Sequence, residues 1–156
     1  MTSQQHIHIE RALLQDIPNL APLFDRYRQF YGQNSDLGGA DAFLRNNLQS
    51  NQSVIYFAFA DERGRPHGFT QLYPMLSSVS MKKLWVLNDL YVEAEFRGQG
   101  AGRALLEAAR KHAAETGAKG LELATAADNK KAQRLYEAAG YKRDVDFYHY
   151  FLSLEE

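Results

Sequence analysis

The chain has 156 residues, with 18 basic and 19 acidic side chains, a formal net charge of −1 at pH 7 and no cysteine. This length suits a single domain, which we place at residues 6–156, and the absence of cysteine excludes a disulfide framework. The balanced charge argues against nucleic acid, no apolar run is long enough for a membrane span, and no signal-peptide pattern is present. We therefore expect a cytoplasmic protein without nucleic-acid or membrane partners.

Hydrophobic periodicity predicts the secondary structure in chain order. A short strand at residues 6–10 precedes a helix that opens at Asp16 and carries an apolar stripe to residue 31, and a second helix follows at residues 40–49. The remaining elements are strands at 53–60, 68–75 and 84–92, a helix at 101–116, a strand at 119–125, a helix at 129–139 and an aromatic strand at 146–154. Pro74 is expected to mark a bulge or the end of its strand. The order β-αα-βββ-α-β-α-β indicates an α/β fold.

A glycine-rich loop joins the apolar strand 84–92 to the following helix. Its sequence is Arg97-Gly98-Gln99-Gly100-Ala101-Gly102. Alternating glycines let the backbone turn sharply and bring its N–H groups near a ligand, and the helix start adds unpaired donors and a favourable dipole. A phosphate or pyrophosphate is the predicted ligand, although a glycine turn can also open a helix for structural reasons alone.

Two common phosphate-binding motifs fit this loop poorly. A nucleoside-triphosphate loop needs Gly-Lys-Ser/Thr, which the chain lacks. A dinucleotide fingerprint fits Gly98 and Gly100, with Glu122 roughly placed as the ribose acid, but Arg103 is too bulky for its third small position.

The loop resembles motif A of the GCN5-related N-acetyltransferases, Q/R-x-x-G-x-G/A. Residues 129–141, with the sequence NKKAQRLYEAAGY, resemble motif B of the same family, and both occur in the expected order. The sequence L-N-D-L-Y-V at residues 87–92 is similar to the diamine and thialysine acetyltransferase branch. The resemblance implies a mixed, partly splayed sheet flanked by helices, and acetyl-CoA as the co-substrate.

The resemblance also implies which residues hold acetyl-CoA. The backbone of Leu90, Tyr91 and Val92 is expected to pair with the pantetheine arm and to polarise the thioester carbonyl. The remaining predicted contacts are Arg97, Gly98, Gln99, Gly100, Ala101, Gly102 and Arg103 at the pyrophosphate, and Asn129 at the arm. Asn129 is also the predicted N-cap of its helix, and exposed arginines at a helix start are often only solvated charges.

Three side chains are predicted to take part in catalysis. The resemblance makes Tyr136 the general acid for the departing thiolate, whereas its helical spacing alone also fits a core residue. Asn88 stands where the similar branch has a glutamate, and an amide cannot accept a proton. Asp89 could take that proton or attract a cationic amine, or could simply bind a neighbouring turn.

The sequence defines the amine acceptor only broadly. Tyr27, Tyr31 and Asp36 lie in a region that walls the acceptor site in family enzymes, and acid plus aromatic residues suit a cationic amine. We expect a primary amine, either a polyamine, a diamine or an amino acid-like molecule, attacked directly without an acyl-enzyme. The alternatives are acetylation of an aminoglycoside, a peptide N-terminus or a protein lysine, or a non-catalytic CoA-binding regulatory module. No metal site is predicted, and the aromatic strand 146–154 suggests a homodimer.

Overall fold

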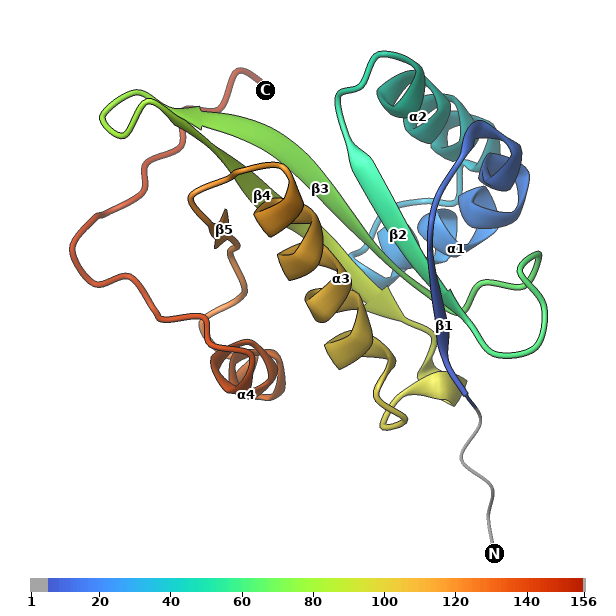
Figure 1. Cartoon of the computed structure of the whole chain (residues 1–156). Coiled ribbons are helices and arrows are strands. Elements are labelled where there is room, and N and C mark those ends of the chain that lie inside the picture. The colour runs from blue at the N-terminus through green and yellow to red at the C-terminus, as the bar shows by residue number, and fades with distance from the viewer. Residues whose placement is uncertain (1–5, 156) are drawn as a thin grey trace, which may run out of the picture. The chain divides into compact units, whose positions relative to one another are not determined.

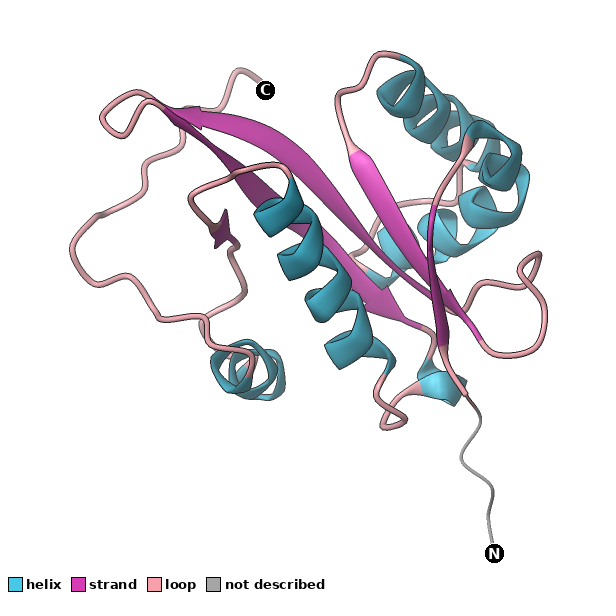
Figure 2. Ribbon diagram, in the orientation of Figure 1, coloured by secondary structure: helices cyan, strands magenta, loops and turns pink. Residues whose placement is uncertain are grey.

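The computed structural model describes residues 6–155, which form two compact units, one ending at Ala124 and the other beginning at Thr125. The first contains the five strands and three of the four α-helices, as Figures 1 and 2 show. Its elements are β1 (His8–Arg11), η1 (Leu14–Asp16), α1 (Ile17–Phe30), α2 (Leu37–Gln49), β2 (Val54–Phe59), β3 (Gly68–Ser77), β4 (Lys82–Val92), η2 (Ala94–Phe96), α3 (Ala101–Glu115) and β5 (Leu121–Glu122).

The five strands form one sheet in the order β1-β2-β3-β4-β5. The first four strands are antiparallel to their neighbours, and β5 pairs with β4 in parallel after the α3 crossover. Pairing with β5 is brief, since it joins only Trp85 to Leu121 and Val86 to Glu122. The predicted α/β class with a mixed sheet flanked by helices is confirmed.

The two faces of the sheet are covered by different helices (Figure 1). On one face, α1 and α2 pack on Ile55, Phe57 and Phe69, with Tyr91 at the margin of the cluster. On the other face, Leu105 of α3 packs with Ala58 and with residues of β4. We call these the α1–α2 face and the α3 face. Apolar residues on both faces explain why the central strands read as continuous hydrophobic runs.

A β-bulge in β4 decides which side chains reach each face. Leu72 pairs with Leu87 and Gln71 pairs with Asp89, so Asn88 is an extra residue without a counterpart on β3. Without the extra residue, alternation would keep Asp89 on the face of Leu87. With it, Asp89 turns to the α1–α2 face, where it meets Tyr27 of α1.

Some predicted boundaries differ from the structure for identifiable reasons. Helix α2 begins at Leu37, three residues before its predicted start, because Asp36 accepts a hydrogen bond from Gly39 N and caps it. Pro74 neither ends β3 nor lies at a bulge, because the strand continues to Ser77 and its register shift falls between Gln71 and Leu72. Beyond Leu72 only β4 pairs with β3, so the missing N–H of Pro74 is tolerated on an open edge. Strand β5 is also shorter than the predicted 119–125.

The second unit contains one helix, α4 (Lys130–Ala138), close to its predicted range. The predicted strand at 146–154 is wrong, because no residue of that range is assigned to a strand. A strand needs a hydrogen-bonded neighbour, and the aromatic pattern that suggested one does not supply it. The aromatic side chains are instead exposed, with Tyr148 at 90% and Tyr150 at 93%.

Thr70 provides a test of the bulge. It is fully buried, and its Oγ1 donates to the carbonyl oxygen of Asp89 over 2.8 Å. Thr70→Val keeps the shape but removes the hydroxyl that donates to this buried carbonyl, which should lower the free energy of unfolding by about 1–3 kcal/mol. Urea unfolding measures the change, and Thr70→Ser, which keeps the hydroxyl, is the control. Equal stability of the valine variant and the parent would contradict this role.

Candidate active site

The glycine loop takes the conformation that its sequence requires. Gly98 and Gly100 have φ angles of +78° and +91°, and a Cβ added at either would meet nothing within 4 Å. The first helical hydrogen bond of α3 runs from Ala104 N to Gly100 O over 3.0 Å, so the preceding N–H groups of the first turn are available. The loop is therefore an open cradle of backbone donors at a helix N-terminus, which fits a pyrophosphate.

The carboxyl end of β4 lies beside this cradle and extends past its neighbour. Pairing with β5 stops at Val86, whereas β4 continues to Val92. The edge from Leu87 to Val92 that faces away from β3 therefore has no partner strand among residues 6–124. Free backbone groups along such an edge can pair with the amides of an extended ligand. The structure thus joins two predicted parts, the 90–92 backbone and the loop.

Asp89 is the centre of a buried polar network on the α1–α2 face. It is 5% exposed, and its carboxylate accepts hydrogen bonds from three side chains. Tyr27 Oη donates to Oδ1 over 2.7 Å, Asn88 Nδ2 donates to Oδ1 over 3.1 Å, and Gln71 Nε2 donates to Oδ2 over 2.8 Å. Gln71 accepts in turn from Asn47 Nδ2 of α2 over 3.5 Å. The predicted pair of Asn88 and Asp89 is brought together with the predicted Tyr27.

Two opposing effects act on the pKa of Asp89. Burial raises it, and the three donors lower it by less, so the pKa is raised. The pKa of Asp89 is higher in the folded protein than in the unfolded chain. The titration of Asp89 therefore contributes to the free energy of unfolding fully below the unfolded pKa, and this contribution is lost as pH rises through the folded pKa. A raised pKa also makes the carboxylate a stronger base than an exposed aspartate, which suits proton removal.

Aromatic rings extend from Asp89 toward the protein surface. Tyr27 lies 5.1 Å from Tyr31 and 5.7 Å from Tyr91 between ring centroids, and Phe30 lies 6.0 Å from Tyr91. Phe30 and Tyr31 are 62% and 63% exposed. Burial and the adjacent Asp89 raise the pKa of the Tyr27 phenol, which therefore stays a donor. Tyr27 and Tyr31 thus belong to one surface next to Asp89.

Asp36, the third residue predicted to bind the acceptor, has a structural role. One carboxylate oxygen caps α2, as described above, and its backbone N–H donates to Asp25 over 2.7 Å. It also lines a hollow of about 340 Å³ between α1 and α2, together with Phe24, Arg28 and Phe43.

The two arginines that flank the loop differ in their surroundings. Arg97 Nε donates to the carbonyl oxygen of Val92 over 2.8 Å, and the guanidinium carbon lies 5.6 Å from the Phe30 ring and 5.7 Å from the Tyr91 ring. Both rings belong to the α1–α2 side, opposite α3. Arg103 is exposed on the first turn of α3.

The second unit holds two predicted site residues. Asn129 caps α4 as predicted, since its Oδ1 accepts from Ala132 N over 3.1 Å. Tyr136 lies on α4, its ring 6.0 Å from that of Tyr141. The catalytic role of Tyr136 and the pantetheine contact of Asn129 stay predictions.

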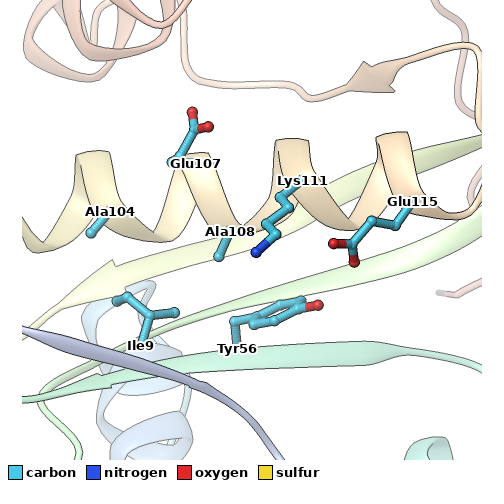
Figure 3. A pocket seen from close by; sticks show the side chains of 7 residues that line it. All are labelled: Ile9, Tyr56, Ala104, Glu107, Ala108, Lys111 and Glu115. Carbon is cyan, nitrogen blue, oxygen red and sulfur yellow. The ribbon is translucent and has the colours of Figure 1, made fainter.

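Another hollow, of about 350 Å³, lies on the α3 face (Figure 3). Ile9 and Tyr56 face α3 from β1 and β2, and Lys111 stands between Glu107 and Glu115 on the helix. None of these residues belongs to the predicted site. Within residues 6–155, no three histidine, aspartate or glutamate side chains gather as a metal site, and no helix has the length and apolarity to cross a membrane.

Gln71, Asn47 and Thr70 were missed by the sequence reasoning. All three are buried, and each belongs to the hydrogen-bond network around Asp89. The adjacent pair Thr70-Gln71 gave a usable signal, because two polar residues interrupt a strand that is otherwise apolar. Asn47 gave no signal, since an asparagine near a helix end is commonly solvated.

Comparison with known proteins agrees with this geometry. The model of the acetyltransferase (GNAT) family matches residues 20–141. The chain is 49% identical over 148 residues to the uncharacterized N-acetyltransferase YhfO of Bacillus subtilis, which covers 95% of this chain and 98% of YhfO. The crystal structure of a probable acetyltransferase has a TM-score of 0.90 and 43% identity, covering 96% of this chain and 99% of that one.

A shorter match relates the chain to the D-amino-acid N-acetyltransferase HPA3 of Saccharomyces cerevisiae, with 35% identity over 91 residues, or 58% of this chain and 56% of HPA3. The chain belongs to the GNAT family and is an N-acetyltransferase of that family. Membership implies acetyl-CoA as the acyl donor. The names of these three proteins give no support to the diamine and thialysine acetyltransferase branch, so the similarity to that branch stays a prediction.

Tyr27→Phe tests the electrostatics of Asp89. The variant keeps the ring but removes a hydrogen bond that favours the charged carboxylate, so the pKa of Asp89 should rise further. Carboxyl-carbon NMR titration measures this pKa directly. Tyr31→Phe is the control, because Tyr31 contacts the Tyr27 ring rather than Asp89. An unchanged or lower pKa in Tyr27→Phe would contradict the assignment.

Proposed function

We propose that the protein transfers the acetyl group of acetyl-CoA to the primary amine of a small molecule by direct attack. The observation that carries this proposal is the junction of β4 and α3. There an unpaired strand edge leads into an open glycine cradle, and a buried carboxylate lies on the opposite face of the same strand. The edge and cradle suit a long thioester that ends in a pyrophosphate, and the carboxylate suits an amine.

Each part of the chain has a defined task in this reaction. Bound acetyl-CoA supplies an electrophilic thioester carbonyl. The backbone N–H groups of residues 98–103 would hold its pyrophosphate, and the edge of Leu90–Val92 would hold its arm and donate to the thioester oxygen. A donor of this kind lowers the barrier by roughly 3–4 kcal/mol in well-studied enzymes.

Proton transfer requires an acid and a base. An aliphatic amine with a pKa of about 10.4 is almost entirely ammonium at neutral pH, so it must lose a proton before attack. We assign this proton to Asp89, directly or through water, with Asn88 orienting the carboxylate. The amine nitrogen then bonds to the carbonyl carbon, the carbon–sulfur bond breaks, the nitrogen loses its second proton to solvent, and the thiolate takes a proton. We assign that donation to Tyr136, on the basis of the resemblance.

For the acceptor we propose a chemical class of amines and not one compound. A polyamine, a diamine or an amino acid-like amine all fit a buried carboxylate beside aromatic rings. The likeness to a D-amino-acid N-acetyltransferase supports the amino acid-like member of this group. A homodimer is likewise part of the proposal, with the exposed aromatic residues of 147–154 available for a second copy.

Gly100→Val tests the cradle. Valine at φ +91° is strained by roughly 1–2 kcal/mol and places methyl groups where the backbone should approach the pyrophosphate. We expect acetyl-CoA affinity to fall sharply, as measured by calorimetry on protein with native circular dichroism. Gly117→Val, with φ +72° at the other end of α3, carries similar strain away from the loop and should bind normally. Equal affinities for the two variants would remove the loop from the site.

Tyr136→Phe tests the acid. The substitution keeps the ring and removes only the hydroxyl, so kcat should fall about 10²–10⁴-fold if general acid catalysis is required. Acetyl-CoA affinity should change little. Tyr141→Phe, on a residue whose ring contacts that of Tyr136, is the matched control. Parent-like turnover by Tyr136→Phe would assign the residue to packing.

A further inference from the structure

The position of Arg97 differs from the one its sequence motif suggested. Its neighbours in the motif are the phosphate-binding backbone groups at the start of α3. The side chain, however, extends to the α1–α2 side, where its guanidinium lies over Phe30 and Tyr91. Tyr91 packs with the α1–α2 cluster, whereas its strand neighbours Leu90 and Val92 pack with α3. Arg97 therefore shares a face with Asp89 and Tyr27, the side that we assign to the acceptor.

The guanidinium is also anchored without being neutralised. Nε is fixed by the carbonyl oxygen of Val92 over 2.8 Å, which leaves the two terminal nitrogens for other partners. No carboxylate of residues 6–155 forms an ion pair with the guanidinium, and that of Glu93, which directly follows β4, accepts instead from Arg26 Nε over 2.6 Å. A guanidinium held by its Nε and by two aromatic rings presents a planar pair of donors, the geometry that binds a carboxylate.

The same surface is poorly suited to a second ammonium group. The exposed ring of Phe30 and the ring of Tyr91 would attract a cation, but Arg97 already occupies them. The acids of α1 and the α1–α2 connection are engaged as well. Asp25 accepts from Ser35 Oγ and from Asp36 N, each over 2.7 Å, and Asp36 caps α2. Asp89 is engaged too, by three neutral donors, but among these acids it is the one bound to Tyr27, so the aromatic wall offers this carboxylate for an amine and one guanidinium for an anion.

From this arrangement we propose that Arg97 recognises an acidic group of the acceptor, so that the preferred acceptor is an amino acid-type molecule rather than a polyamine or diamine. The ammonium group is directed to Asp89, the carboxylate is directed to Arg97, and the body between them contacts Tyr27 and Tyr91. This inference rests on the proposed function and narrows its substrate class. It also reassigns Arg97 from the pyrophosphate to the acceptor.

Matched acceptors test the proposal. Tyrosine and tyramine differ only in the carboxylate, as do phenylalanine and phenethylamine, and putrescine and spermidine represent the multiply charged class. With the parent enzyme, release of CoA thiol should give a kcat/KM about 10- to 100-fold higher for the acid member of each pair, the effect expected for a charged hydrogen bond. The polyamines should be the poorest acceptors.

Variants at position 97 separate this recognition from other causes. A carboxylate also lowers the pKa of the neighbouring ammonium, an effect that does not depend on Arg97, so the decisive result is that Arg97→Gln lowers the ratio within each pair by raising KM for the acid member. Arg97→Lys, which keeps the charge but not the planar fork, should restore part of the preference. The affinity of acetyl-CoA, measured by calorimetry, should be unchanged in both, and Arg103→Gln should leave the acceptor ratios at the parent value.

The possible failures are distinguishable. A preference for putrescine or spermidine in the parent, or an intact carboxylate preference in Arg97→Gln, would overturn the inference while leaving the proposed function standing. Weakened acetyl-CoA binding with unchanged acceptor ratios in Arg97→Gln would return the residue to the cofactor. Binding of acetyl-CoA without thiol release on any acceptor would overturn the proposed function, and this inference with it.

Discussion

The bulge at Asn88 is the constraint on which the site depends. A regular β4 would place Asp89 on the same face as Leu87 and Trp85, among the apolar contacts of α3. One extra residue transfers the carboxylate to the opposite face, where Tyr27 and Gln71 can bind it. The hydroxyl of Thr70 holds the carbonyl of Asp89 at this point, so the strand geometry and the side-chain network are stabilised together.

In the function that we propose, β4 serves two ligands, and the bulge makes this possible. After Asn88, the side chains of Asp89 and Tyr91 belong to the α1–α2 side, while Leu90 and Val92 contact the α3 side. Within residues 6–124, the backbone edge between the two faces has no partner strand beyond Val86, because β5 ends there, and only the carbonyl oxygen of Val92 is bound, by Arg97 Nε. A thioester held along that edge would therefore lie between the phosphate cradle and the acceptor wall. Proximity of this kind is a large part of what an acyl-transfer enzyme contributes.

Much of this arrangement could be predicted from the sequence, for definite physical reasons. Long periodic helices such as α1 and α3 and the capping role of Asn129 depend on local interactions, which a sequence pattern records. The positive φ angles of Gly98 and Gly100 follow from the glycines themselves. The motif resemblance supplied the family, which the comparisons confirm. It did not supply the acceptor, because the surface that we propose for the acceptor includes residues of α1, outside both motifs.

The parts that the sequence did not predict depend on contacts between distant residues. The register shift opposite Gln71 arises from the pairing of β3 with β4, and nothing in the local sequence L-N-D-L distinguishes it from a regular strand. Arg97 illustrates the same limit. Its position in the motif does not show where the guanidinium lies, which depends on the exposed ring of Phe30 and the half-buried ring of Tyr91. The prediction of a strand at 146–154 failed for the opposite reason. The local aromatic pattern favours a strand, but these residues pair with no strand within residues 6–155.

The buried network around Asp89 has a consequence for how this sequence can change over time. Gln71, Asn47 and Asp89 fill positions where apolar side chains of similar volume would pack without the cost of desolvating a carboxylate and two amides. Substitution of the whole set by such residues is therefore expected to give a more stable but inactive protein. A single substitution leaves a buried polar group without its partner and therefore lowers the free energy of unfolding. Selection for stability alone would remove this network, so its persistence in a lineage would mark the chemistry that we propose at Asp89 as still in use.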